Sequence, residues 1–359
     1  MRLVEVRGHD RVQAMLTRAL ERDRLPPALL FSGPEGVGKK TLALAVAQAA
    51  LCEVGPSGAA CGACSTCRRV EAGVRSLPDL RREADRRPDE DVWRNFRLHP
   101  DLVLVEGWRL TRGGRPRPEP EIRVDQVRDL IVEISGAPFE ARRRVFVVDD
   151  AHGMNESAQN ALLKSLEEPP PRSHVLLVTS APLGLRQTIR SRCQVLRFGP
   201  LPRALVASYL REHRRLSAEE AHLRAGLGGG SLGAALAFES AAYRETREQV
   251  LILLERVAEL GAVERMEESE RLDRAEDPQL VLTTLRSLLR DVAVVRAGSP
   301  PDRLVNADVG DRLAVIAAGP LGERAERLAE RVGEARAALR GFASRLLTFE
   351  VLLDALAGG

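Results

Sequence analysis

The chain has 359 residues, of which 44% are apolar and 29% charged, and its formal net charge is +3. No apolar run approaches the ~20 residues that span a bilayer, which argues against an integral membrane protein. The N-terminal residues contain no apolar signal region, so we expect a cytoplasmic protein without membrane association. The length predicts two or three domains, and so small a net charge does not by itself indicate nucleic-acid binding.

Strands and helices alternate over the first 200 residues, which predicts a parallel sheet with helices on both faces. Charged stretches at 79–95 and 109–121 interrupt the alternation, and we expect surface loops there. A DNA contact is one reading of the second stretch, and the sequence assigns no role to the insert at 74–96. The expected strands are 28–33, 101–105, 144–148, 174–178 and 194–198, and the clearest helices are 124–134 and 155–168.

After Pro200 the pattern becomes helical, with no convincing strand. We therefore expect an α/β domain at 1–201, a small helical lid domain at 202–240 and an all-α collar domain at 241–359. The expected helices are 203–214, 217–225, 241–261, 278–296, 323–341 and 345–357.

A glycine-rich segment follows the first strand and opens a helix, which is the setting of a phosphate-binding loop. It reads Gly33-Pro34-Glu35-Gly36-Val37-Gly38-Lys39-Lys40-Thr41. Lys39 is placed to reach phosphates, but the complete motif requires a hydroxyl directly after that lysine to bind Mg²⁺. Lys40 stands there instead, and Thr41 is rotated by ~100° around the helix. The loop predicts a degenerate nucleotide site, with ATP or ADP as the candidate ligand and metal-assisted hydrolysis impaired.

The strand at 144–148 is followed by two carboxylates, Asp149 and Asp150. Beside a phosphate loop, the first acid commonly holds Mg²⁺, and the second commonly polarises the attacking water. Asp150 is one methylene shorter than the glutamate suited to that task, which further weakens hydrolysis. The alternative is a pair of strand-end acids that cap the next turn.

Four cysteines, Cys52, Cys61, Cys64 and Cys67, lie within sixteen residues. In a cytosolic chain such spacing indicates a metal site more often than disulfides, and four thiolates suit a closed, structural Zn²⁺ site. An iron–sulfur cluster is the alternative, although the Cys-Pro ending of the ferredoxin motif is missing. Cys193 lies far from this cluster and is expected to be a buried small residue.

The segment Thr188-Ile189-Arg190-Ser191-Arg192-Cys193 precedes the last expected strand. An arginine at a subunit edge can stabilise charge on a neighbour's γ-phosphate. With so many arginines in this sequence, an ordinary surface arginine is the competing reading.

In this order, these motifs resemble the delta-prime subunits of the bacterial DNA polymerase III clamp loader, a AAA+ family. The resemblance covers the whole chain. Asn160-Ala161-Leu162-Leu163-Lys164 together with Ser191-Arg192-Cys193 carries most of it, and the phosphate loop alone is not specific. Further matches are Gly8-His9-Asp10, His99-Pro100-Asp101, Asp149-Asp150-Ala151-His152, Gly230-Ser231-Leu232-Gly233 and Arg345-Leu346-Leu347-Thr348-Phe349-Glu350.

The resemblance implies a P-loop AAA+ domain, a helical lid and a collar that assembles with gamma or tau motor subunits and a delta subunit. The implied assembly is a hetero-pentameric ring, part of the polymerase holoenzyme, that loads the sliding clamp onto primed DNA. Arg192 matches the family's arginine finger, and the four cysteines match its zinc ligands. The chain itself is expected to lack ATPase and polymerase activity.

Two other functions are retained. An active motor subunit of the gamma or tau type keeps a full phosphate loop, an Asp-Glu pair and an arginine in the lid, where this chain has Lys40, Asp150 and Gly233. A zinc-containing DNA-binding module would bind DNA alone, with a strong salt dependence.

Overall fold

A computed structural model describes residues 5–55, 58–86, 95–110, 116–340 and 343–358. The chain forms two compact units, which are described separately. Unit 1 comprises Met1–Val206 and Gly230–Gly233, and unit 2 comprises Ala207–Gly229 and Ala234–Gly359. The segment 202–240 is thus shared between the units, and the division into three domains stays a prediction.

Unit 1 is built on a six-stranded sheet with the order β2-β3-β6-β7-β1-β8. All neighbouring strands run parallel except β2, which is antiparallel to β3. The central strands are buried along their length, as expected where both faces of a sheet are covered. The strands are β1 (Ala28–Ser32), β2 (Asn95–His99), β3 (Leu102–Val105), β6 (Arg144–Val148), β7 (Ser173–Thr179) and β8 (Gln194–Arg197).

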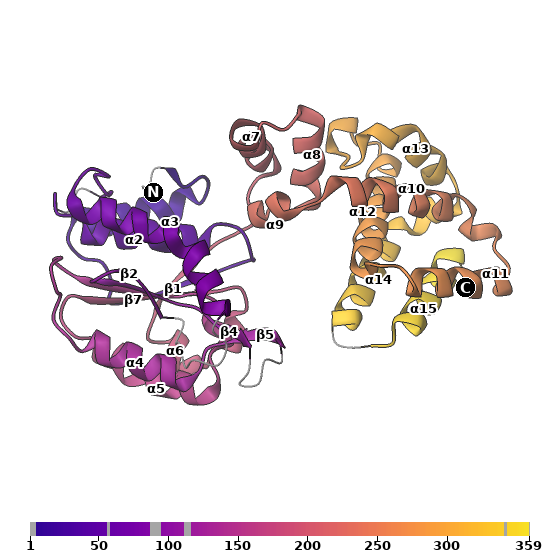
Figure 1. The fold of residues 1–359 in the computed structure, drawn as a ribbon. Helices are drawn as coiled ribbons and strands as arrows, with labels where there is room; N and C mark the ends of the chain where they lie inside the picture. The colour runs from indigo at the N-terminus through magenta and orange to yellow at the C-terminus, as the bar shows by residue number, and fades with distance from the viewer. Residues whose placement is uncertain (1–4, 56–57, 87–94, 111–115, 341–342, 359) are drawn as a thin grey trace. The chain divides into compact units, whose positions relative to one another are not determined.

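Helices pack on both faces of this sheet (Figure 1). One face is covered by α1 (Asp10–Glu21), α2 (Lys39–Leu51) and α3 (Ser65–Arg86), whose apolar residues form one core cluster with the sheet. The other face is covered by α4 (Val124–Ile134) and α5 (Glu156–Glu167), followed by the short α6 (Gln187–Arg190). This arrangement confirms the predicted α/β fold class.

The two charged stretches are more regular than the predicted loops. Helix α3 continues through the first stretch to Arg86, because Leu77 is buried and Leu80 packs against the core, while Asp79 and Arg82 are exposed. In the second stretch, β4 (Trp108–Leu110) pairs antiparallel with β5 (Pro116–Glu121). The loop predictions were therefore wrong for these parts, while residues 87–94 and 111–115 lie outside the described residues.

Strand β2 was also missed by the sequence analysis. Its Phe96 and Leu98 are buried and alternate with the exposed Arg97, which is the period-2 pattern of a strand. That short signal directly follows the charged insert and precedes a turn into β3.

Unit 2 is helical throughout its described residues, and no helix there or in unit 1 is long and apolar enough to cross a membrane. Its helices are α7 (Arg203–Arg214), α8 (Ala218–Leu227), α9 (Leu232–Ala237), α10 (Ser240–Arg256), α11 (Ala262–Asp273), α12 (Pro278–Arg296), α13 (Gly310–Ala318), α14 (Pro320–Arg340) and α15 (Arg345–Ala357). The first residues of α7 and α9 belong to unit 1. Short 3-10 turns are η4 (Val257–Glu259), η5 (Pro301–Arg303) and η6 (Ala307–Val309) in unit 2, and η2 (Ala151–Gly153) and η3 (Pro182–Gly184) in unit 1.

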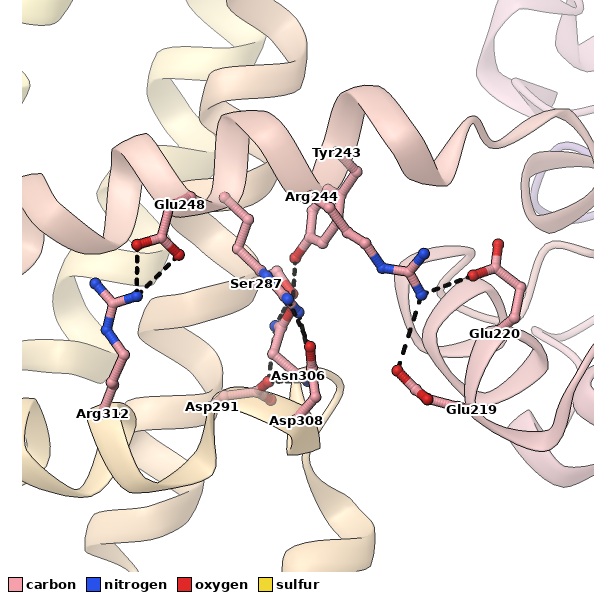
Figure 2. Close-up of polar contacts among 11 residues, drawn as sticks. Glu219, Glu220, Tyr243, Arg244, Glu248, Ser287, Asp291, Asn306, Asp308 and Arg312 are labelled. Carbon is pink, nitrogen blue, oxygen red and sulfur yellow. Dashed lines mark hydrogen bonds and ion pairs between the residues drawn. The ribbon is translucent and has the colours of Figure 1, made fainter.

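A buried polar network joins α10, α12 and η6 in unit 2 (Figure 2). The amide oxygen of Asn306 accepts a hydrogen bond from the Tyr243 hydroxyl at 2.8 Å, and its amide nitrogen donates to Ser287 and Asp291. Arg247 forms a bidentate ion pair with Asp308. Because Asn306 and Asp291 are fully buried, these bonds replace the water that both side chains lose on folding.

Candidate functional site

The glycine-rich segment forms the turn between β1 and α2. Gly36 and Gly38 have φ values of 71° and 98°, a region that residues with a Cβ seldom adopt. Helix α2 begins at Lys39 without a side-chain cap. The Lys39 ammonium is buried and donates to the carbonyls of Gly33 at 2.8 Å and Pro34 at 2.6 Å. Burial lowers the pKa of Lys39, against the opposing charges of Asp150 and Asp149.

Lys40 occupies the place where the phosphate-loop motif predicts a metal ligand. Its ammonium forms ion pairs with Glu106 and, at 2.9 Å, with Asp149. Glu106 also accepts two hydrogen bonds from Arg81, at 2.8 and 2.5 Å. Burial disfavours ionisation of Glu106, but these hydrogen bonds and the Lys40 charge outweigh it, so the pKa of Glu106 is lowered.

The order of the strands explains why these charged side chains meet at one place. Glu106 follows β3 and Asp149 follows β6, and neighbouring parallel strands end at the same edge of the sheet. Helix α2 brings Lys40 to this edge, and α3 brings Arg81. Sequence analysis singled out Lys40 and Asp149 but missed Glu106 and Arg81, although Glu106 stands directly after a predicted strand.

The remaining predicted nucleotide-site residues lie around this group. Asp150 follows Asp149, and burial, with the adjacent Asp149 charge, raises the pKa of Asp150. Thr41 is exposed one position further along α2. The acid pair does not fit a Mg²⁺ ion as arranged here, because Asp149 is already neutralised by an ammonium that would repel the metal.

The segment Gly230–Gly233 closes against the loop. The Gly233 amide donates to the Gly36 carbonyl at 2.9 Å. A Cβ at Gly233 would lie 3.0 Å from the Gly36 Cα, and a Cβ at Gly36 would lie 2.2 Å from the Ser231 hydroxyl. Glycine at 233 therefore permits a backbone contact that an arginine there would crowd.

The four cysteines form a compact cluster between α2 and α3. Their sulfur atoms all lie within 4.8 Å of one another, and the Cys52–Cys64 and Cys61–Cys67 pairs are 4.0 Å apart. These separations are about twice a disulfide bond but close to the roughly 3.8 Å edge of a tetrahedron with metal–sulfur bonds of about 2.3 Å. The four thiols thus fit a metal ion with tetrahedral coordination.

Backbone amides surround the same sulfurs. The N–H groups of Ala63 and Cys64 donate to Cys61 and lower its pKa to about 6. Cys67 N–H donates to Cys64, and Cys61 N–H donates to Cys52. Glu53, which sequence analysis missed, accepts from Ser65 and Thr66 and so caps the start of α3. Cys193 is buried away from the cluster, and burial raises its pKa to about 12.

Arg192 lies just after α6, with a third of its side chain exposed. Its guanidinium pairs with Glu167 at the end of α5 and donates to the Thr188 carbonyl at 2.9 Å. Neither contact involves the phosphate loop of the same chain.

The sequence of this chain is similar to those of known proteins. The sequence model described as "DNA polymerase III, delta subunit" matches residues 8–202. A delta' subunit from Bacillus subtilis is 33% identical over 54% of this chain and 49% of its own length. A Pseudomonas aeruginosa delta' subunit is 34% identical over 67% of this chain and 63% of its own.

Gamma and tau subunits match as well. A Mycobacterium tuberculosis gamma/tau subunit is 30% identical over 97% of this chain and 59% of its own length. An Escherichia coli tau subunit is 32% identical over 53% of this chain and 24% of its own length. The chain thus spans between 24% and 63% of these curated relatives. Among solved structures, a gamma-subunit-related protein from Thermotoga maritima aligns with 96% of this chain and 98% of its own at 17% identity, with a TM-score of 0.35.

The relatives carry both delta' and gamma/tau names, and the family match covers more than half of the chain, including the phosphate loop, the cysteine cluster and Arg192. The chain therefore belongs to the DNA polymerase III delta subunit family of clamp-loader proteins.

Proposed function

We propose that this chain is a delta-prime-like clamp-loader subunit that does not hydrolyse ATP and instead presents Arg192 to the ATP of a neighbouring motor subunit. The ion pairs of Lys40 with Asp149 and Glu106 carry the proposal. Hydrolysis in phosphate-loop enzymes needs Mg²⁺ between the phosphates and this first acid. An internal cation at that acid removes the metal's ligand and repels the metal.

The surroundings of Arg192 support the second half of the proposal. The side chain is partly exposed, and its ion pair with Glu167 is a surface pair that contributes little stability. A phosphate on another subunit could therefore displace Glu167 at small cost. The planar guanidinium is suited to such an anion.

In this proposal the partners are gamma or tau motor subunits and a delta subunit in a hetero-pentameric ring. The ring acts on a sliding clamp and primed DNA. Residues 202–240 serve as the lid and residues 241–359 as the collar that joins the ring. The four cysteines hold a structural Zn²⁺ ion, which completes a module between α2 and α3 and leaves no coordination position for water.

The motor-subunit alternative is favoured by the gamma/tau match along nearly the whole chain. Steady-state ATP turnover by the isolated chain separates the two functions. We expect no appreciable turnover with Mg²⁺ present. Turnover that is abolished by Lys39→Ala would establish a motor and overturn the proposal.

The arginine is tested in rings reconstituted with motor and delta subunits. Arg192→Ala and Arg192→Lys should leave assembly intact but lower DNA-stimulated ATP hydrolysis and, more strongly, clamp loading. The loss should be below the 10³–10⁵-fold range of a dedicated arginine finger, since one ATP site of several borders this subunit. Arg186→Ala is the matched control, because Arg186 is also exposed and paired, with Glu156. Parental loading rates with Arg192→Ala would show that Arg192 is an ordinary surface residue.

A further inference from the structure

Unit 2 contains a cavity of about 630 Å³ between the end of α8 and the neighbouring helices α12 and α14. This volume lies within the roughly 300–1,000 Å³ range of small-molecule pockets, which are mostly apolar with a few convergent polar groups. Much of the lining is apolar and includes Leu227, Ala293, Val305 and Ala329. Of the described residues that line the cavity, none belongs to the phosphate loop, the cysteine cluster or the surroundings of Arg192.

Three arginines line the same cavity, Arg286 and Arg290 from α12 and Arg336 from α14. Arg286 and Arg290 are one helical turn apart, so both lie on one side of α12. Within the described part of the chain, the Arg286 guanidinium has no hydrogen bond or ion pair with another residue. Arg290 pairs with the adjacent Asp291 at 3.2 Å. A guanidinium is a planar fork of N–H donors that matches a carboxylate, so an anion in the cavity would supply the acceptor that Arg286 lacks.

The charges are arranged along the length of the cavity. Two glutamates of α14 also line it, Glu326 and Glu330. The Arg296–Glu323 ion pair places the end of α12 beside the start of α14, so the two helices are antiparallel. At about 1.5 Å per residue, Arg286 and Arg336 lie about 15 and 20 Å from this pair along their helices, toward the same end of the cavity. Glu326 is less than one turn from Glu323. The cavity therefore has a basic end and an acidic end.

We infer that this cavity binds a small organic monocarboxylate with an apolar body. The carboxylate contacts Arg286 at the basic end, and the apolar body lies against Ala293 and Ala329. A second anionic group at the other end would meet Glu326, so the site disfavours a ligand with a negative charge at each end. A phosphate ester carries nearly two charges at neutral pH and fits less well beside two glutamates. The inference concerns a ligand site in unit 2 and goes beyond the proposed function.

Saturation-transfer NMR of the full chain with octanoate, an alkyl monocarboxylate, tests the inference. We expect octanoate to bind, and its dissociation constant should rise about tenfold in Arg286→Gln, the loss expected for one charged hydrogen bond. This variant breaks no side-chain contact within the described part of the chain, so the melting temperature should stay at the parental value. Arg327→Gln is the matched control that retains binding, because Arg327 is exposed on α14 and does not line the cavity.

Suberate, the dicarboxylate of the same length, tests the acidic end of the cavity. It should bind about tenfold more weakly than octanoate, because its second carboxylate meets Glu326. Absence of octanoate binding, an unchanged dissociation constant in Arg286→Gln, or equal binding of suberate and octanoate would overturn the inference. None of these results bears on the proposed function, which fails only on ATP turnover or on the Arg192 variants.

Discussion

The Lys40 ammonium lies 2.9 Å from a carboxylate oxygen of Asp149 and bridges it to Glu106, a residue that directly follows β3. This bridge ties the first turn of α2 to two strand ends. Because Arg81 adds α3 to the same group, one carboxylate, Glu106, holds two helices against the sheet edge.

Glu106→Gln should therefore destabilise unit 1 by about 1–3 kcal/mol, because two partly buried cations lose their charged acceptor. Urea unfolding measures the loss. Glu71→Gln is the matched control: Glu71 pairs with an exposed Arg75 and should cost less than about 1 kcal/mol. Equal losses for the two variants would contradict a structural role for the Glu106 pairs.

The stability lost in Glu106→Gln should depend on pH. The pKa of folded Glu106 is lowered, so the unfolded chain binds the proton more readily. The stabilisation by Glu106 is then complete above its unfolded pKa of about 4.3 and is lost as the pH falls through the lower folded pKa. The stability difference between the parent and Glu106→Gln should be constant near neutral pH and shrink in acid. A difference that grows in acid would reverse the assigned sign.

The cysteine cluster predicts one zinc ion per chain. Metal analysis of protein prepared without added zinc should give a stoichiometry near one, and removal by a chelator should lower the melting temperature, because the metal links α2 to α3. Cys61→Ser or Cys64→Ser should reduce both quantities, whereas Cys193→Ala, outside the cluster, should retain the metal. Strong visible absorption from iron–sulfide charge transfer would identify an iron–sulfur cluster instead.

The buried network of unit 2 predicts strong coupling between two residues. Asn306→Ala should cost about 2–4 kcal/mol, because it removes the buried hydrogen bonds of the Asn306 amide with the Tyr243 hydroxyl, Ser287 and Asp291. Tyr243→Phe alone should cost about 1 kcal/mol. The double variant should lose less stability than the sum of the two single variants, because both single changes remove the same Tyr243–Asn306 hydrogen bond. Strict additivity in denaturant unfolding would mean that the bond contributes nothing.

Local patterns predicted the parallel strands of the sheet in unit 1 and the phosphate loop, because each depends on a run of adjacent residues, whereas β2 at the sheet edge was missed. The strand at 144–148 was predicted with its observed bounds, followed by Asp149. Partners of these residues were harder to predict. Lys40 and Glu106 are 66 positions apart and meet only because β3 and β6 are neighbours in the sheet.

The charged composition of α3 led to the wrong prediction of a surface loop at 79–95. Its many arginines and acids suggested a loop, yet a few apolar residues such as Leu77 anchor it as a helix, and that helix carries Arg81 to the site. In unit 2, the sequence analysis did not predict α9, α11 and α13, and the helix predicted at 241–261 was too long, since α10 ends at Arg256. A break inside a helical pattern leaves little local signal.

The path of the chain between the two units affects how the protein can be divided. Gly230–Gly233 belongs to unit 1, although the residues on both sides of it belong to unit 2. A fragment ending at residue 206 would contain the whole glycine-rich motif and yet lack the Gly233 amide that holds the Gly36 carbonyl. Nucleotide affinities measured on such a fragment would describe an altered loop, so an excised N-terminal unit needs residues 230–233 returned to it, by a linker or as a peptide.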